Sequence, residues 1–245
     1  MTPSFNHSPP ENGLLDAEYA SAKENTPFLK NRASDKLKHL LQSYVPQFNR
    51  YACSAASVAI MVNAIHRLKD NIENFTPITQ QALLDNVDVV HWKERLSREG
   101  YKGRHGVTLE DLRIICIEAL DVYGISYETI DALSLKETMP DLNVKKHEVR
   151  RKLIQMATSG NDFILAYFTQ GELTGEWFGS HVSPVGTFDP EKQIVLMMDV
   201  DPEVNRPYWV SFDQFFISLV GSNNTYHRRG GGWVRIRMVD ANRSF

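Results

Sequence analysis

The sequence is poor in cysteine and has no long hydrophobic run. Two cysteines among 245 residues, Cys53 and Cys116, are too few for a disulfide framework, and their spacing does not match paired zinc ligands. A single bridge between them is left open by the sequence and would remove both thiols from chemistry. No stretch of 18 apolar residues is present, so we expect no transmembrane helix.

An excess of basic charge is also missing. The formal net charge is -3, which gives no electrostatic reason to expect a nucleic-acid partner or a membrane surface. Residues 1–25 are polar and contain three prolines, unlike the basic start and apolar centre of a secretory signal. As the sequence stands we expect a cytoplasmic monomer or homodimer, with export by another route left open.

The remaining composition is that of a folded protein, with 42% hydrophobic and 23% charged residues. Residues 1–30 lack apolar periodicity, so we expect a mobile polar arm there. We expect residues 31–240 to form one folded unit and residues 241–245 to be a tail. Apolar spacing predicts helices over 33–44, 53–70, 79–99, 109–123, 144–158 and 213–220, and strands over 125–130, 163–168, 180–188, 194–200 and 232–238. The fold class is therefore α+β, with a helical N-terminal lobe and a C-terminal lobe of antiparallel sheet.

Cys53 is the first residue of the helix predicted over 53–70. Unpaired backbone N–H groups at a helix N-terminus favour a thiolate, which is the nucleophilic form of cysteine. Gln47 lies six residues upstream, where its amide could donate to a developing oxyanion. Cys116, in contrast, falls on the apolar side of its helix and is expected to be a core residue.

His181 is the histidine with the best chemical context among the eight in the chain. It opens one predicted strand, and Asp199 ends the next, so a hairpin would place the two side chains together. His181 follows Cys53 by 128 residues, near the interval of about 130 between nucleophile and base in papain-like enzymes. Gln47, Cys53, His181 and Asp199 thus supply an oxyanion donor, a nucleophile, a base and a residue that orients the base.

These motifs resemble the catalytic domain of phytochelatin synthases, which are glutathione γ-glutamylcysteinyltransferases of the papain-like cysteine peptidase superfamily. The resemblance extends from about Lys36 to Val239. It rests on the segments 47–53, 106–112, 161–165, 179–184 and 198–200, together with Ala55, Ser57, 62–64 and 209–210. It implies a papain-like fold, with the catalytic domain spanning residues 31–240.

The resemblance implies that Cys53 attacks the carbonyl carbon before the glycine of glutathione. Glycine would leave and a γ-glutamylcysteinyl thioester would remain on the sulfur. Water would release γ-Glu-Cys, whereas a second thiol peptide would extend the chain into a phytochelatin. His181 would act as base and then as acid, Asp199 would orient it, and Gln47 with the Cys53 N–H would bind the oxyanion.

The resemblance also implies substrate-binding roles for Arg229, Asn223 and Ser180. Arg229 matches an Arg-Gly motif that binds the γ-glutamyl carboxylate. Asn223 or Asn224 stands where the family has an acidic residue for the substrate amino group. Other departures are Ser54 in place of a glycine and the segment 201–207, which replaces an arginine and a Tyr-Pro-Pro motif.

No metal cofactor is expected for catalysis, and Cd or Zn would enter the site as thiolate complexes of glutathione. The resemblance also implies that the protein acts in heavy-metal detoxification. Because the sequence shows no Cys-rich C-terminal extension, hydrolysis is favoured over long-chain synthesis. Two alternatives stay open. One is an amidase, deamidase or protease on the same fold, and the other is an inactive module that binds thiol peptides or a protein.

Overall fold

The computed structural model describes residues 32–70, 76–175, 179–204, 207–221 and 230–239. The predicted arm, residues 1–30, and the predicted tail, residues 241–245, lie outside this range. The helices are α2 (Arg32–Gln42), α3 (Cys53–Asp70), α4 (Gln80–Asn86), α5 (Trp92–Arg95), α6 (Leu109–Val122), α7 (Leu142–Thr158), α8 (Gly171–Thr174) and α9 (Phe212–Val220). The strands are β1 (Tyr127–Leu135), β2 (Asp162–Thr169), β3 (Ser180–Asp189), β4 (Ile194–Met197), β5 (Tyr208–Ser211) and β6 (Gly231–Met238).

The strands form one antiparallel sheet with the order β1-β6-β2-β3-β4-β5. This confirms the α+β class and the antiparallel sheet. The division into a helical lobe and a later sheet lobe is less sharp than predicted. Strand β1 precedes α7, before the segment that the sequence assigned to the sheet lobe, and pairs with β6, which is the last strand of the chain. The sheet is thus built from strands that a helix separates in the sequence.

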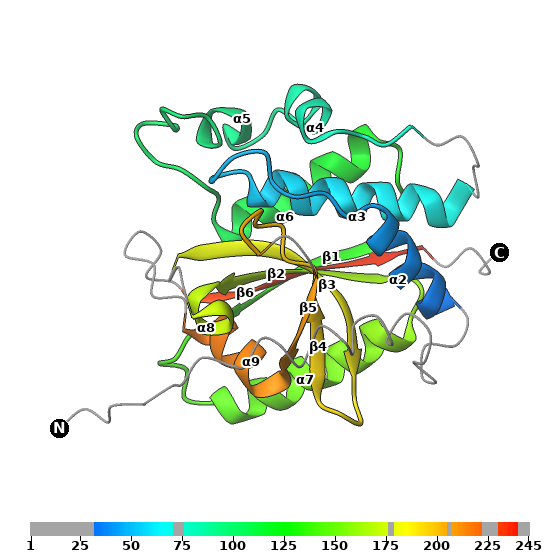
Figure 1. Ribbon diagram of the computed structural model, residues 1–245, viewed down its shortest axis with the longest axis vertical. Coiled ribbons are helices and arrows are strands. Elements are labelled where there is room, and N and C mark those ends of the chain that lie inside the picture. Colours follow the sequence, from blue (N-terminus) through cyan, green and yellow to red (C-terminus); the bar gives the residue numbers. More distant parts are fainter. Residues whose placement is uncertain (1–31, 71–75, 176–178, 205–206, 222–229, 240–245) are drawn as a thin grey trace.

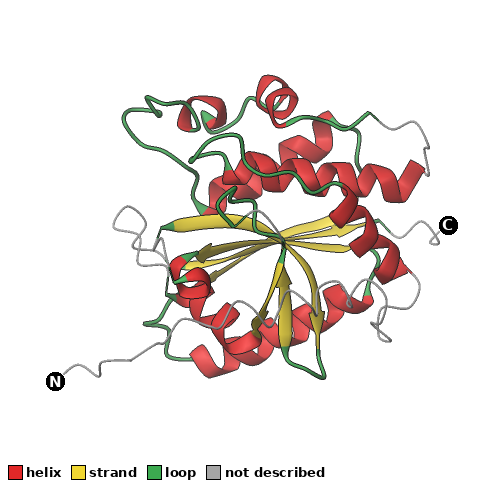
Figure 2. Cartoon of the chain, in the orientation of Figure 1, coloured by secondary structure: helices red, strands yellow, loops and turns green. Residues whose placement is uncertain are grey.

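Helices cover both faces of this sheet, as Figures 1 and 2 show. Helices α3, α4 and α6 pack on one face, and their side chains form a large apolar cluster with β2 and β6. Helices α7 and α9 pack on the other face and form a second cluster. The sheet therefore separates two cores, and its central strands β2 and β3 are buried along almost their whole length.

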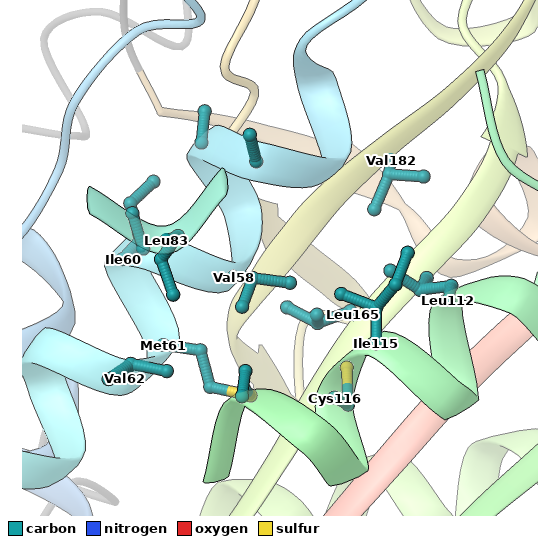
Figure 3. Packing of buried hydrophobic residues seen from close by; sticks show 14 of the residues in the cluster. Val58, Ile60, Met61, Val62, Leu83, Leu112, Ile115, Cys116, Leu165 and Val182 are labelled. Carbon is teal, nitrogen blue, oxygen red and sulfur yellow. The ribbon is translucent and has the colours of Figure 1, made fainter. Parts of the chain in front are cut away.

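Helix α3 is buried on nearly all sides. The predicted stripe of Val58, Met61, Val62 and Ile65 is fully buried, and so are the alanines between them. Figure 3 shows this packing, with the side chain of Cys116 from α6 inside the same cluster. Cys116 is a free, buried thiol, as predicted, and Cys53 is also free, so the bridge left open by the sequence is not formed.

The predicted helix over 79–99 is wrong in its length. The segment forms two short helices, α4 and α5, because the chain between them contains β-branched Val87, Val89 and Val90, which disfavour helix. Val90 and His91 adopt φ values of 48° and 55°, in the left-handed region. Strand β5 was also missed, since four residues are too few for a clear alternation. Helix α6 begins with a capping box formed by Thr108 and Asp111.

Lys36 joins α2 to the far side of the sheet. Its side chain is 1% exposed, and Nζ donates to the carbonyl oxygens of Met156, Ser159 and Asp162. The first two carbonyls lie at the C-terminal end of α7, where helix carbonyls lack intrahelical partners. The three donors of one ammonium group therefore satisfy three acceptors from distant parts of the chain.

Replacing Lys36 with methionine should lower the free energy of unfolding by about 2 kcal/mol, because buried carbonyl oxygens lose their donor. Urea unfolding followed by circular dichroism measures this change. Lys38→Met, at an exposed position of the same helix, is the matched control and should leave stability nearly unchanged. Equal stability of the two variants would contradict a structural role for Lys36.

Candidate active site

Cys53 is the first residue of α3 and is partly exposed. The loop before it is held by Asn49, whose side chain accepts from the Tyr51 N–H at 2.8 Å and donates to the Leu96 carbonyl at 3.0 Å. The first N–H groups of a helix have no intrahelical acceptor, so this terminus offers donors and a partial positive charge beside the sulfur. The position predicted from the sequence is confirmed.

His181 lies on β3, directly opposite Phe168 of β2, and is 2% exposed. Its Nε2 is 2.8 Å from Asp199 Oδ1, so the predicted hydrogen bond between the two residues is present. A side-chain hydrogen bond also joins His181 to Cys53. Because Nε2 is engaged by Asp199, the other ring nitrogen, Nδ1, is the one that serves the sulfur.

Electrostatics favour an imidazolium at this position. Burial lowers the pKa of His181, but the charge of Asp199 and hydrogen bonds to Asp199 and Cys53 outweigh it and raise the pKa to about 10. Burial alone would raise the pKa of Asp199, yet the His181 charge and several donors hold it below its usual value. The raised pKa of His181 and the lowered pKa of Asp199 are both expected for a buried pair of opposite charges.

Asp199 receives further support from neighbouring groups. The Asp201 N–H donates to Oδ1 at 3.0 Å, and the Tyr208 hydroxyl donates to Oδ2 at 2.8 Å. Burial and the adjacent carboxylate raise the pKa of Tyr208, which therefore stays a donor. Tyr208 was not predicted. It lies on the short strand β5, and only contact across the sheet reveals its role.

Three hydrogen bonds hold the nucleophile side of the site against the histidine side. Ser57 Oγ, one turn into α3, donates to the carbonyl of Val182 at 2.9 Å, next to His181. The Tyr44 hydroxyl donates to the carbonyl of Asp199 at 2.6 Å, and the Gln47 N–H donates to the carbonyl of Val200 at 2.8 Å. These bonds fix the relative positions of segments far apart in the sequence.

Gln47 is placed on this junction, with 8% of its surface exposed. Its backbone is tied to Val200, and its side-chain Oε1 has no hydrogen-bond partner among the described residues. Its role as an oxyanion donor remains a prediction.

The predicted substrate-binding residues are less completely placed. Ser180 begins β3 next to His181, is partly exposed and hydrogen-bonds to Tyr167, a buried tyrosine whose pKa burial raises to about 12. Cys53 also acts on that pKa, so Tyr167 is a further neighbour of the sulfur that the sequence did not indicate. Arg229 and Asn223 lie outside the described residues.

Ser54, which follows the nucleophile, is 1% exposed, and its hydroxyl accepts a hydrogen bond from Trp92 Nε1 at 2.9 Å. The serine that departs from the family pattern therefore anchors the start of α3 to α5. No cluster of three or more His, Cys, Asp or Glu side chains suited to a metal ion occurs in the described part of the chain. Within the same residues, no helix is long and apolar enough to cross a membrane.

Asp199→Asn should lower the pKa of His181 by about 2 units or more, because the charge that favours the imidazolium is removed. The midpoint of the His181 titration is measured from imidazole ¹⁵N chemical shifts. The His181 signal is assigned as the one that is lost in His181→Gln. The pair also stabilises the fold below about pH 6.5, and this contribution is lost as pH rises through about 10. Asp121→Asn, at an exposed site, is the control, and an unmoved midpoint in Asp199→Asn would count against the pair.

Cys53 should react with iodoacetamide at least about tenfold faster than Cys116, since thiolate character and access set the rate. Burial raises the pKa of Cys116, which is 0% exposed. Mass spectrometry of peptides after timed alkylation of the folded protein gives both rates. His181→Gln should slow the reaction of Cys53 and leave that of Cys116 unchanged, and comparable labelling of both thiols in the unmutated protein would revive the inactive-module alternative.

Comparison with curated protein sequences found no match. The family model described as phytochelatin synthase matches residues 16–231, which include Gln47, Cys53, His181 and Asp199. Members of that family are enzymes that use glutathione and transfer γ-glutamylcysteine. With most of its length matched, the chain belongs to the phytochelatin synthase family.

Proposed function

We propose that the chain is a papain-like cysteine acyltransferase that cleaves glutathione at its Cys–Gly bond. The observation that carries the proposal is the buried His181–Asp199 pair, which is hydrogen-bonded to the sulfur of Cys53 at the start of α3. Thiol acyl-transfer enzymes have this arrangement: a nucleophile on a helix, a base on a strand and a third residue that orients the base.

In the first half-reaction, the Cys53 proton passes to His181 Nδ1 and the thiolate attacks the carbonyl carbon of the cysteinyl residue. The oxyanion is stabilised by the Cys53 N–H and by the Gln47 side-chain amide. His181 then protonates the nitrogen of glycine, the C–N bond breaks, and glycine leaves. The γ-glutamylcysteinyl group remains on Cys53 as a thioester.

In the second half-reaction, a water molecule attacks the thioester while His181 accepts its proton. The C–S bond breaks, and γ-Glu-Cys and the free thiol are formed. The amino group of a second thiol peptide would instead give a phytochelatin by the same steps. Cd or Zn would take part as the thiolate complex of the substrate, with no ion resident on the protein.

Hydrolysis is favoured over transfer by the charge near the site. Asp201 is partly exposed, two residues from the catalytic aspartate, and glutathione is itself an anion. A carboxylate at this position repels a second anionic peptide more than it does water. We assign Arg229 to the γ-glutamyl carboxylate, and Asn223 and Ser180 to polar contacts with the same end of the substrate.

Incubation with glutathione, with and without Cd²⁺, followed by mass spectrometry, tests the proposal. We expect equimolar glycine and γ-Glu-Cys from the unmutated protein and a loss of at least about 10³-fold in Cys53→Ala. Cys116→Ala is the matched control and should keep the activity. Intact glutathione under every condition would overturn the proposal, and release of ammonia from other amides would favour the amidase alternative.

A further inference from the structure

Gln170 lies where β2 ends, beside the start of β3. Its N–H donates to the carbonyl of Gly179, and its carbonyl accepts from the N–H groups of Leu173 and Thr174, the last two residues of the short helix α8. These backbone bonds fix the position of the residue. The side chain is 2% exposed and points into the group of residues around Asp199, rather than to solvent.

The amide of Gln170 contacts two carboxylates. Its Nε2 is 3.0 Å from Asp201 Oδ2 and 3.5 Å from Asp199 Oδ2. An amide nitrogen has two hydrogens, so it can donate one to each carboxylate. The opposite orientation of the amide would place its oxygen against both anions and is excluded by charge.

Asp201 is held in place from its other side. Its Oδ1 accepts from the Glu203 N–H at 3.0 Å, and its carbonyl accepts from the Val204 N–H. Its own N–H donates to Asp199 Oδ1. The second carboxylate is therefore part of a structured turn and is fixed close to the first.

Two carboxylates this close normally repel each other, and the pKa of one of them rises. The side chain of Asp199 is faced by the imidazole of His181, with Cys53 behind it, and by the hydroxyl of Tyr208. It is also faced by the N–H and carboxylate of Asp201 and by the amide of Gln170. The hydroxyl of Tyr44 donates to the backbone carbonyl of Asp199. Among the residues that the structure describes, Gln170 is the one whose side chain hydrogen-bonds to both Asp199 and the second carboxylate, Asp201.

We propose that Gln170 is a positioning residue: it donates to Asp199 and Asp201 together, so that Asp199 keeps its alignment on His181 beside a second carboxylate. The inference rests on the proposed role of Asp199 in the reaction. It assigns a function to the second carboxylate, which adds negative charge near the imidazolium while Gln170 holds it apart from Asp199.

The test measures the rate of Cys53 alkylation by iodoacetamide between pH 3 and pH 10. At the acid end the rate falls because the sulfur takes up a proton, and a weaker His181–Asp199 pair makes that protonation easier. Gln170→Met keeps the volume but removes the donor, so the acid midpoint should move up by about one pH unit. In the double variant Gln170→Met/Asp201→Asn most of this shift should disappear, because the repelling carboxylate is gone.

Gln155→Met, an exposed glutamine on α7, is the control and should leave the profile unchanged. An unmoved midpoint in Gln170→Met would overturn the proposal, and an equal shift with and without Asp201 would overturn the bridging role. If Gln170→Met does not fold by circular dichroism, Gln170→Asn, which withdraws the amide by one methylene, replaces it and should shift the midpoint in the same direction.

The alkylation assay does not depend on glutathione. A shifted midpoint together with no cleavage of glutathione would keep the role of Gln170 and overturn only the proposed substrate. An unmutated profile that rises only near pH 8.5, as for an ordinary thiol, would overturn the proposed mechanism itself.

Discussion

The buried hydrogen bond between His181 and Asp199 is the interaction on which the functional part of this structure depends. A buried carboxylate is costly unless it is paired and hydrogen-bonded. Here Asp199 is fully buried and receives donors from His181, Tyr208 and the Asp201 backbone. The charge pair can therefore persist next to Cys53, and the low local polarity strengthens its effect on the sulfur.

The sheet supplies the frame for this pair. Strands β2 and β3 are buried on both faces, since α3 and α6 cover one and α7 and α9 the other. A strand held between two cores has little freedom to shift, and the Ser57 to Val182 hydrogen bond fixes α3 against it. Cys53 and His181 come from two different layers, and the packing of these layers sets the distance between the two side chains.

The neighbourhood of the pair is more acidic than the catalytic chemistry alone requires. Asp201 adds a second carboxylate, Gln170 lies between it and Asp199, and Ser54 is bonded to Trp92 behind the nucleophile. Of these residues, Ser54 and Asp201 are at positions where the sequence analysis noted a difference from the phytochelatin synthase pattern. Both lie beside the group formed by Cys53, His181 and Asp199.

The sequence by itself determined the local features: the helix that Cys53 opens, the buried Cys116, the strand that begins near His181 and the strand that ends near Asp199. Each leaves a signal within a few residues, as periodicity, a cap or a turn. Only the tertiary structure decided that β1 joins β6, that Lys36 binds carbonyls beyond α7, and that Tyr208 and Gln170 support Asp199. These contacts join residues distant along the chain, and such contacts leave no local pattern because only the packing of the sheet brings them together.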